Sequence, residues 1–351
     1  MAARYVGSSV GAFDVVPAGP AVRRAGPVLL RVGGAAAVLL VLGHRVGAAP
    51  FQDGLRAVTP AAVAAAVAVT AVTTVCSAWR WQVIARALGV GLPPATAVGA
   101  YYRSQFLNSV LPGGIAGDVH RAVAHGRAAG DLGRGVRAVG WERSSGQVVQ
   151  AVLTGVVLVA LPSPVRPVLP VVAAGVAVAA AVAALVVRGA ARRGASRVAA
   201  VARTVAGDVR HGLLARAVWP RVTVASVLVV AGHTTVFVIA ARAAGAAAPL
   251  SELVPLALLV QTAMVIPLSV GGWGPREGAA AWAFAAAGLG AGTGVTVTTV
   301  FGVLSLAAVA PGLGVLVASA VRRRPRRRTA TPLATVAVRR GYPGDLPAKS
   351  S

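Results

Sequence analysis

The sequence predicts an all-α membrane protein, a polytopic bundle of about eight transmembrane helices with an additional re-entrant helical hairpin. Of the 351 residues, 56% are hydrophobic, and the mean hydropathy is +0.75. Only 12% of the residues are charged, whereas a soluble globular domain carries about 25%. Apolar runs recur along the whole chain, and most approach the length of about 20 residues with which an α-helix crosses a bilayer.

Polar or basic loops separate these apolar runs. The first run follows Arg23 and Arg24, which loosely resembles a secretory or twin-arginine signal. Because the leader is long and no clean A-x-A site follows, we expect an uncleaved first helix. The seventh run is short, and whether it crosses the whole bilayer stays open. The eight candidate spans are 27–45, 59–79, 139–161, 168–187, 221–241, 252–270, 276–290 and 295–319.

Arginine placement orients the candidate spans. Arginines precede the first span, follow the second, precede the third and fill the loop 188–220, whereas the alternate loops are short and poor in arginine. Because cytoplasmic loops carry the excess of basic residues, both termini are expected in the cytoplasm of a multi-pass plasma-membrane protein. The expected organisation is a disordered N-terminus over 1–24, a membrane domain over 25–320 and a basic disordered tail over 321–351.

The charge balance narrows the function classes. The chain has 34 Lys and Arg against 9 Asp and Glu, a formal net charge of +25. Because the basic residues lie between apolar spans, they indicate topology and contact with anionic lipid headgroups, and we expect no nucleic-acid partner. The single cysteine, Cys76, excludes an intrachain disulfide and a Cys-rich metal site. No Walker loop is present, and we expect neither a cofactor nor a metal nor catalytic residues.

A polar segment at 95–117 interrupts the apolar pattern. Basic residues flank it on both sides, so both of its ends are expected on the cytoplasmic face. The segment must then enter and leave the membrane by the same face, as a re-entrant hairpin. Its turn is predicted at Pro112-Gly113-Gly114, where the helix would break. Non-helical backbone at membrane depth survives only when it is buried in protein or lines a wet cavity.

Three acidic residues lie at the edges of apolar segments, each with an arginine close by in the chain. Charges in a membrane usually face a cavity or a partner. At a spacing of three residues, an acid and an arginine can share a helix face, whereas directly adjacent residues diverge and need other partners. We therefore expect one shared polar cluster around a single cavity; the alternative is interfacial charges that reach the headgroups. The residues are Asp118 with Arg121, Glu142 with Arg143, and Glu277 with Arg276.

A second broken stretch, IPLSVGGWGPREG at 266–278, resembles the first one, NSVLPGGIAGDVHR at 108–121. Paired Gly/Pro-broken segments often mark the substrate site of a membrane transporter. Their free amide N–H groups and positive dipole ends suit an anionic group such as phosphate. The alternative is that glycines such as Gly271 and Gly272 only permit close helix packing.

With these motifs in order, the chain resembles the lysylphosphatidylglycerol synthase transmembrane region, also called the UPF0104 or flippase-like family, over roughly residues 25–320. The resemblance implies an all-helical bundle with re-entrant segments that moves aminoacylated phosphatidylglycerol between leaflets. Aminoacyl transfer in full-length synthases belongs to a separate soluble domain for which this chain has no room, so we do not expect that activity. The motifs are Asn108, Leu111-Pro112-Gly113, Gly117-Asp118, Arg121, Glu142-Arg143, Pro267, Gly271-Gly272, Gly274 and Arg276-Glu277.

The sequence therefore predicts a flippase-like lipid translocase that moves or binds an anionic lipid, aminoacylated or polyprenyl-linked. Two alternatives stay open, a membrane enzyme acting on lipid-linked sugars and a non-transporting accessory subunit. Its partners would be membrane lipids, and a homo-oligomer or a complex with a pathway enzyme also stays open. The expected headgroup cavity is lined by Asn108, Pro112, Gly113, Gly117, Asp118, Arg121, Glu142, Arg143, Gly271, Gly272, Gly274, Arg276 and Glu277.

Overall fold

The computed structural model describes residues 33–34, 36–112, 114–192, 197–265 and 273–322, and the secondary structure in these ranges is helical. The predicted all-α membrane fold is confirmed. The predicted tails at 1–24 and, beyond the last helix, at 323–351 lie outside the described residues, as do Gly113, Gly271 and Gly272.

Four long apolar helices confirm four of the predicted spans. They are α3 (Pro60–Ala87), α6 (Leu132–Ala160), α9 (Trp219–Ala243) and the continuous stretch Ala291–Ser319, which comprises α12 (Ala291–Val309) and most of α13 (Pro311–Arg322). Thr59 caps α3 by accepting the Ala62 N–H at 3.2 Å, and Pro60 suits the first helical position because that N–H would have no partner.

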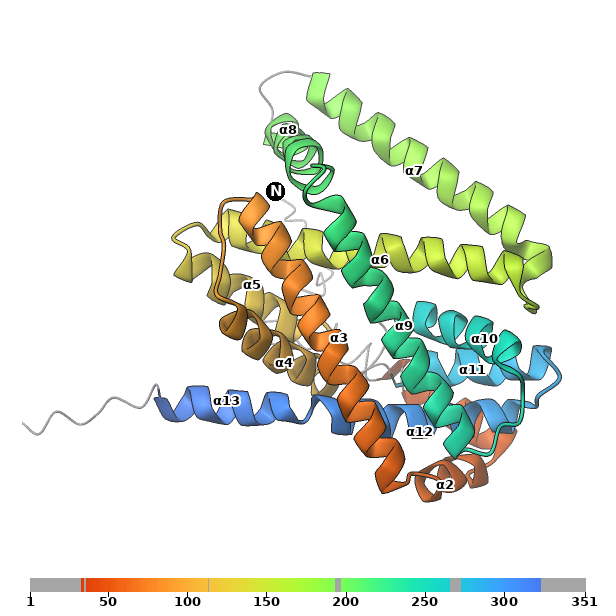
Figure 1. The fold of residues 1–351 in the computed structure, drawn as a ribbon. Helices are drawn as coiled ribbons and strands as arrows, with labels where there is room; N and C mark the ends of the chain where they lie inside the picture. The colour runs from red at the N-terminus through yellow and green to blue at the C-terminus, as the bar shows by residue number, and fades with distance from the viewer. Residues whose placement is uncertain (1–32, 35, 113, 193–196, 266–272, 323–351) are drawn as a thin grey trace, which may run out of the picture.

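The remaining long helix, α7 (Leu169–Arg192), covers the predicted span 168–187 with 24 residues. It packs mainly on α8 (Arg197–Gly207), and Figure 1 shows it standing apart from α6 and α9. Only part of the first predicted span is described, as the helix Ala36–Val46, which precedes the short α2 (Ala49–Arg56). A 3-10 turn, η1 (Arg166–Val168), precedes α7, and a π-helical turn, η2 (Asp208–Leu213), follows α8.

Helices α3 and α9 pack side by side and divide the molecule into two parts (Figure 1). The main hydrophobic core lies on one side, where α10, α11 and α12 meet them. Phe237 lies at its centre, with ring centroids 6.4 Å from Phe284 and 5.6 Å from Phe301. A smaller core around Trp81 lies on the other side, beneath α4 and α5. Residues 114–121 of the first broken segment lie in the part with the smaller core, and residues 273–278 of the second lie in the part with the main core.

The predicted hairpin at 95–117 is present, but it is longer than expected. Its arms are α4 (Pro94–Val110) and α5 (Ala116–Ala128), which pack against each other. Gly114 in the turn has φ +62°, a conformation that only glycine adopts at little cost. Residues 118–128, which follow the predicted hairpin, form most of α5.

Two predicted spans differ from the structure. The spans expected at 252–270 and 276–290 correspond to α10 (Leu250–Ala263) and α11 (Pro275–Ala286), which have 14 and 12 residues. At 1.5 Å per residue these helices reach only about 21 Å and 18 Å, less than the roughly 30 Å of a hydrocarbon core. Because α10 and α11 also pack against each other, we interpret them as the two arms of a second hairpin; residues 266–272 between them lie outside the described residues.

Candidate functional site

Five charged side chains from α3, α5 and α6 form a continuous network, which we call the arginine cluster. At its centre, Glu142 is fully buried and holds two guanidinium groups, one at each carboxylate oxygen. Its Oε2 accepts from Arg121 Nη2 at 2.8 Å, and its Oε1 accepts from Arg80 Nε at 3.1 Å. The members of the cluster are Arg80, Asp118, Arg121, Glu142 and Arg143.

Asp118 joins the cluster to the surface. Its Oδ1 accepts from Arg121 Nη2 at 2.9 Å, and its Oδ2 accepts from Arg143 Nε at 2.8 Å. The Arg143 side chain is 43% exposed, whereas the Arg121 side chain is 1% exposed. Arg143 is therefore the accessible side of the cluster.

Polar side chains of α4 hold Asp118 in place. Ser104 Oγ donates to Asp118 Oδ1 at 3.0 Å, and Asn108 Nδ2 donates to Asp118 Oδ2 at 2.9 Å. The Asn108 side-chain oxygen also accepts the Gly117 N–H at 2.7 Å, across the hairpin turn. Gly117 lies so close to α4 that a Cβ there would meet the Ser104 carbonyl oxygen at 2.1 Å. Asn108 and Gly117 thus build the hairpin that positions Asp118.

The Arg121 guanidinium lies between two aromatic rings, 4.6 Å from the Trp81 centroid and 4.4 Å from the Tyr101 centroid. Such contacts stabilise a cation where water is excluded. Tyr101 also donates its hydroxyl to Glu142 Oε1 at 3.1 Å. Only Nη2 of Arg121 is bonded to the carboxylates; its Nε and Nη1 are buried and have no hydrogen-bond partner among the described residues.

The cluster carries an excess positive charge. It contains three guanidinium groups and two carboxylates, which leaves a net charge of one. A buried charge is costly unless it is paired, and buried N–H groups normally have a partner. The cluster thus has one more guanidinium than carboxylate, and two nitrogens of Arg121 have no partner among the described residues.

The sequence predictions for this part are confirmed in their geometry. Asp118 and Arg121 share a helix face and form an ion pair, and Glu142 and Arg143 each pair with residues other than each other. Sequence reasoning missed Arg80, Tyr101, Trp81 and Ser226, whose hydroxyl accepts from Arg80 Nη1 at 3.0 Å. A signal for Arg80 exists, because it ends a buried polar face of α3 at helical spacing, Thr70, Thr73, Thr74 and Ser77.

The third predicted pair forms a separate unit. Arg276 donates to Glu277 Oε1 from Nε at 2.8 Å and from Nη2 at 2.5 Å, and the Gly274 N–H donates to Glu277 Oε2 at 2.7 Å. Both side chains are buried, and the Arg276 guanidinium stacks 4.5 Å from the Trp273 ring centroid. The expectation that these adjacent residues diverge is wrong, because Glu277 folds back to cap α11 and meets Arg276 there.

The expected single cluster is therefore divided. Across the described residues we find no hydrogen bond or ion pair between the arginine cluster and Arg276 or Glu277. The two turns still share a backbone feature, since Pro112 and Trp273 each form an isolated β-bridge. The predicted binding role of all these residues stays a prediction.

The described pockets lie outside both units. The larger, of about 490 Å³, is lined by one face of α5, and the smaller, of about 270 Å³, lies where the α6–α7 turn meets α10 and α11. Within the described ranges, no group of three or more His, Cys, Asp or Glu side chains is placed to hold a metal ion.

Comparison with known proteins gives a family. Neither the curated proteins nor the solved structures gave a match. The profile of the family described as "Lysylphosphatidylglycerol synthase TM region" matches residues 28–331, which is most of the chain and close to the range expected from the motifs. The chain is thus a multi-pass membrane protein of a lipid-related family, and it belongs to the lysylphosphatidylglycerol synthase transmembrane-region family.

Proposed function

We propose that this protein binds the anionic headgroup of a membrane lipid at the arginine cluster and moves that lipid between the leaflets of the plasma membrane. The observation that carries the proposal is Arg121, a buried guanidinium with two unpartnered nitrogens in a cluster with one excess positive charge. A phosphate oxygen is the acceptor that best suits charged N–H donors. Membership of a lipid-related family supports the same class of ligand.

The cluster offers a route for the headgroup. Arg143 bonds Asp118 through Nε and Nη2 only, so its remaining N–H groups can meet a phosphate without breaking that pair. The headgroup then exchanges from the half-exposed Arg143 to the buried Arg121. A polar group surrounded by protein crosses the hydrocarbon layer at lower cost than one surrounded by lipid tails.

The arginine pattern supports a cytoplasmic opening for this site and cytoplasmic termini. The sequence contains no Walker motif, and we propose movement that is passive or gradient-driven. Asp118 and Glu142 hold the three arginines of the cluster in position by ion pairs. One guanidinium charge is left in excess of the two carboxylates.

Lipid translocation in reconstituted vesicles tests the proposal. The full chain is placed in phosphatidylcholine vesicles that contain a trace of head-labelled phosphatidylglycerol or polyprenyl phosphate, and an impermeant quencher reports the outer-leaflet fraction. We expect quenching to exceed that of empty vesicles. Arg121→Gln should slow translocation about tenfold or more, because it removes a buried charged partner.

The matched control is Arg56→Gln, which removes an exposed arginine paired with Asp53 on α2 and should leave the rate unchanged. Absence of translocation above empty vesicles for both lipid classes would reject the proposal. Equal rates for Arg121→Gln and the wild type would reject the assignment of the site.

A further inference from the structure

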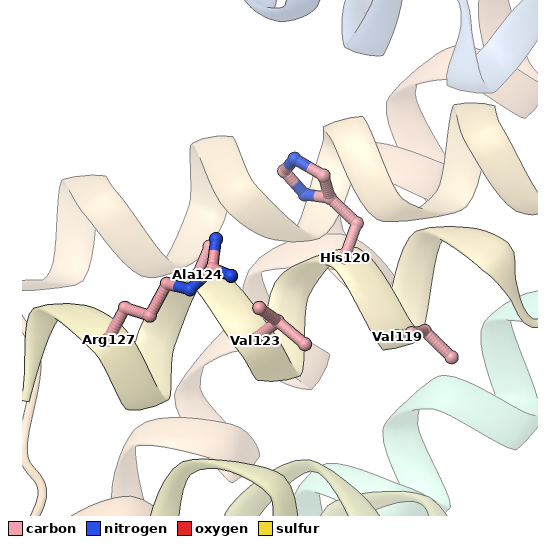
Figure 2. Close-up of a pocket in the computed structure, with 5 residues that line it drawn as sticks. All are labelled: Val119, His120, Val123, Ala124 and Arg127. Carbon is pink, nitrogen blue, oxygen red and sulfur yellow. The ribbon is translucent and has the colours of Figure 1, made fainter. Parts of the chain in front are cut away.

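Helix α5 has two distinct faces. One face is buried and carries Arg121 toward the cluster. The opposite face borders a surface pocket of about 490 Å³, and each described residue that lines this pocket belongs to α5. We call this face the α5 groove, and Figure 2 shows its five side chains, Val119, His120, Val123, Ala124 and Arg127.

The α5 groove is mostly apolar and carries one polar side chain near each end, His120 beside Val119 and Arg127 in the last turn. Val119 lies next to the hairpin turn, and Arg127 lies in the last turn of α5, with about 12 Å of helix between them. Val123 and Ala124 continue the apolar lining between these ends. The Arg127 guanidinium is exposed and has no side-chain partner among the described residues.

An exposed arginine beyond an apolar stretch suits a lipid of the cytoplasmic leaflet. If the hairpin enters from the cytoplasmic face, as the flanking arginines indicate, Val119 lies deep in the bilayer and Arg127 lies near the headgroups. An acyl chain then meets apolar side chains, and its phosphate meets a guanidinium. The polar residues of the groove are basic or imidazole types, with no carboxylate among them.

We infer that the α5 groove binds one anionic phospholipid of the cytoplasmic leaflet, with its chain along Val119 and Val123 and its phosphate at Arg127. The inference deepens the proposed function and rests on it for the orientation of the hairpin. A lipid held there lies on the same helix that carries Arg121, so the groove is the position from which its headgroup reaches the cluster.

Photo-crosslinking tests the inference. The full chain is reconstituted in phosphatidylcholine vesicles with a trace of phosphatidylglycerol that carries a diazirine in its acyl chain, and labelled peptides are identified by mass spectrometry. We expect labelling of 119–127 that unlabelled phosphatidylglycerol displaces and additional phosphatidylcholine does not. A phosphatidylcholine probe should label the same residues more weakly.

Two variants separate chain and headgroup contacts. Val123→Trp should fill the groove and abolish labelling of α5. Arg127→Gln should reduce the preference for the anionic probe about fivefold, the size expected for one basic residue facing anionic lipid. The matched control is Val152→Trp, at an apolar α6 side chain that is 60% exposed, and it should leave labelling of α5 unchanged.

Equal labelling by both probes, or unchanged labelling in Val123→Trp, would mean that α5 only contacts the lipids of the surrounding bilayer. Either result would overturn the inference. The outcome is separable from that of the proposed function, because labelling does not require translocation. Selective labelling of a protein that moves no lipid would support lipid binding in the α5 groove and reject the proposed translocation. Translocation without selective labelling would support the proposed translocation and reject selective lipid binding in the α5 groove.

Discussion

Glu142 shows how much of the site depends on a single residue. It is fully buried, and Arg80, Arg121 and Tyr101 all donate to its carboxylate. Without that charge, two buried guanidinium groups would lose their shared counterion. Removing one partner of a buried ion pair typically costs about 3–5 kcal/mol, far more than the intact pair contributes relative to apolar packing.

Glu142→Gln should therefore destabilise the protein by about 3–5 kcal/mol. The measurement is thermal unfolding of the purified protein in detergent. Asp53→Asn, which neutralises the exposed partner of Arg56, should change stability by about 1 kcal/mol or less. Similar unfolding temperatures for the two variants would contradict a central role for Glu142.

At the residue scale, the sequence predicted pairs that follow from helix spacing. The Asp118–Arg121 pair is an example, because positions three apart face the same way. Arg80 could not be predicted in the same way, since a lone arginine at the end of a span also marks topology. The Arg276–Glu277 contact depends on how the α11 cap bends the carboxylate back, which spacing alone does not reveal.

At the scale of elements, the α4–α5 hairpin depends on close backbone contact. Gly117 faces Ser104, and Gly126 of α5 meets Gly135 of α6, where a Cβ on Gly135 would lie 2.3 Å from the Gly126 Cα. Small residues at such points let membrane helices approach closely. The hairpin itself could be predicted from arginine counting. The extent of α5 could not, because its basic residues are also typical of a cytoplasmic loop, and only the structure shows which of them are buried against neighbouring helices.

Gly117→Ala should separate α4 from α5, since the new Cβ would lie 2.1 Å from a carbonyl oxygen. We expect a loss of about 1–3 kcal/mol, the usual cost of overpacking, together with slower translocation because Asp118 moves from Asn108. Gly140→Ala is the control, because nothing lies within 4 Å of its new Cβ. If both alanine variants behave as the wild type does, the close approach has no role.

At the scale of the whole molecule, the α4–α5 hairpin and the α10–α11 pair lie on either side of the long helices α3 and α9 (Figure 1). With α10 and α11 as a hairpin, its two outer ends adjoin the connections 244–249 and 287–290, which contain no arginine, whereas basic residues flank α4 and α5. If α4 and α5 open to the cytoplasm, as we propose, the two hairpins enter the membrane from opposite faces. Hydropathy could not distinguish this arrangement from two more spans, because short buried helices are as apolar as spanning ones.

Cysteine labelling distinguishes the two topologies. In a Cys76→Ala background, Ala129→Cys should react with an impermeant maleimide from the cytoplasmic side and Ala286→Cys from the outer side. If α10 and α11 form a hairpin that turns inside the bilayer, Trp273→Cys should react more slowly than Ala129→Cys and Ala286→Cys, whichever side the maleimide is added to. Labelling of Trp273→Cys from the cytoplasmic side, at the rate of Ala129→Cys, would restore two full spans.

The central claim, that Arg121 binds a lipid phosphate, is tested most directly by the affinity of short-chain phosphatidylglycerol for the wild type and for Arg121→Lys. Lysine keeps the positive charge and the contacts with Trp81 and Tyr101 but lacks the planar set of N–H groups that Arg121 leaves unpartnered. We predict a dissociation constant about tenfold higher for a folded Arg121→Lys protein, a difference of about 1.4 kcal/mol. An unchanged dissociation constant would contradict the claim and place the headgroup elsewhere.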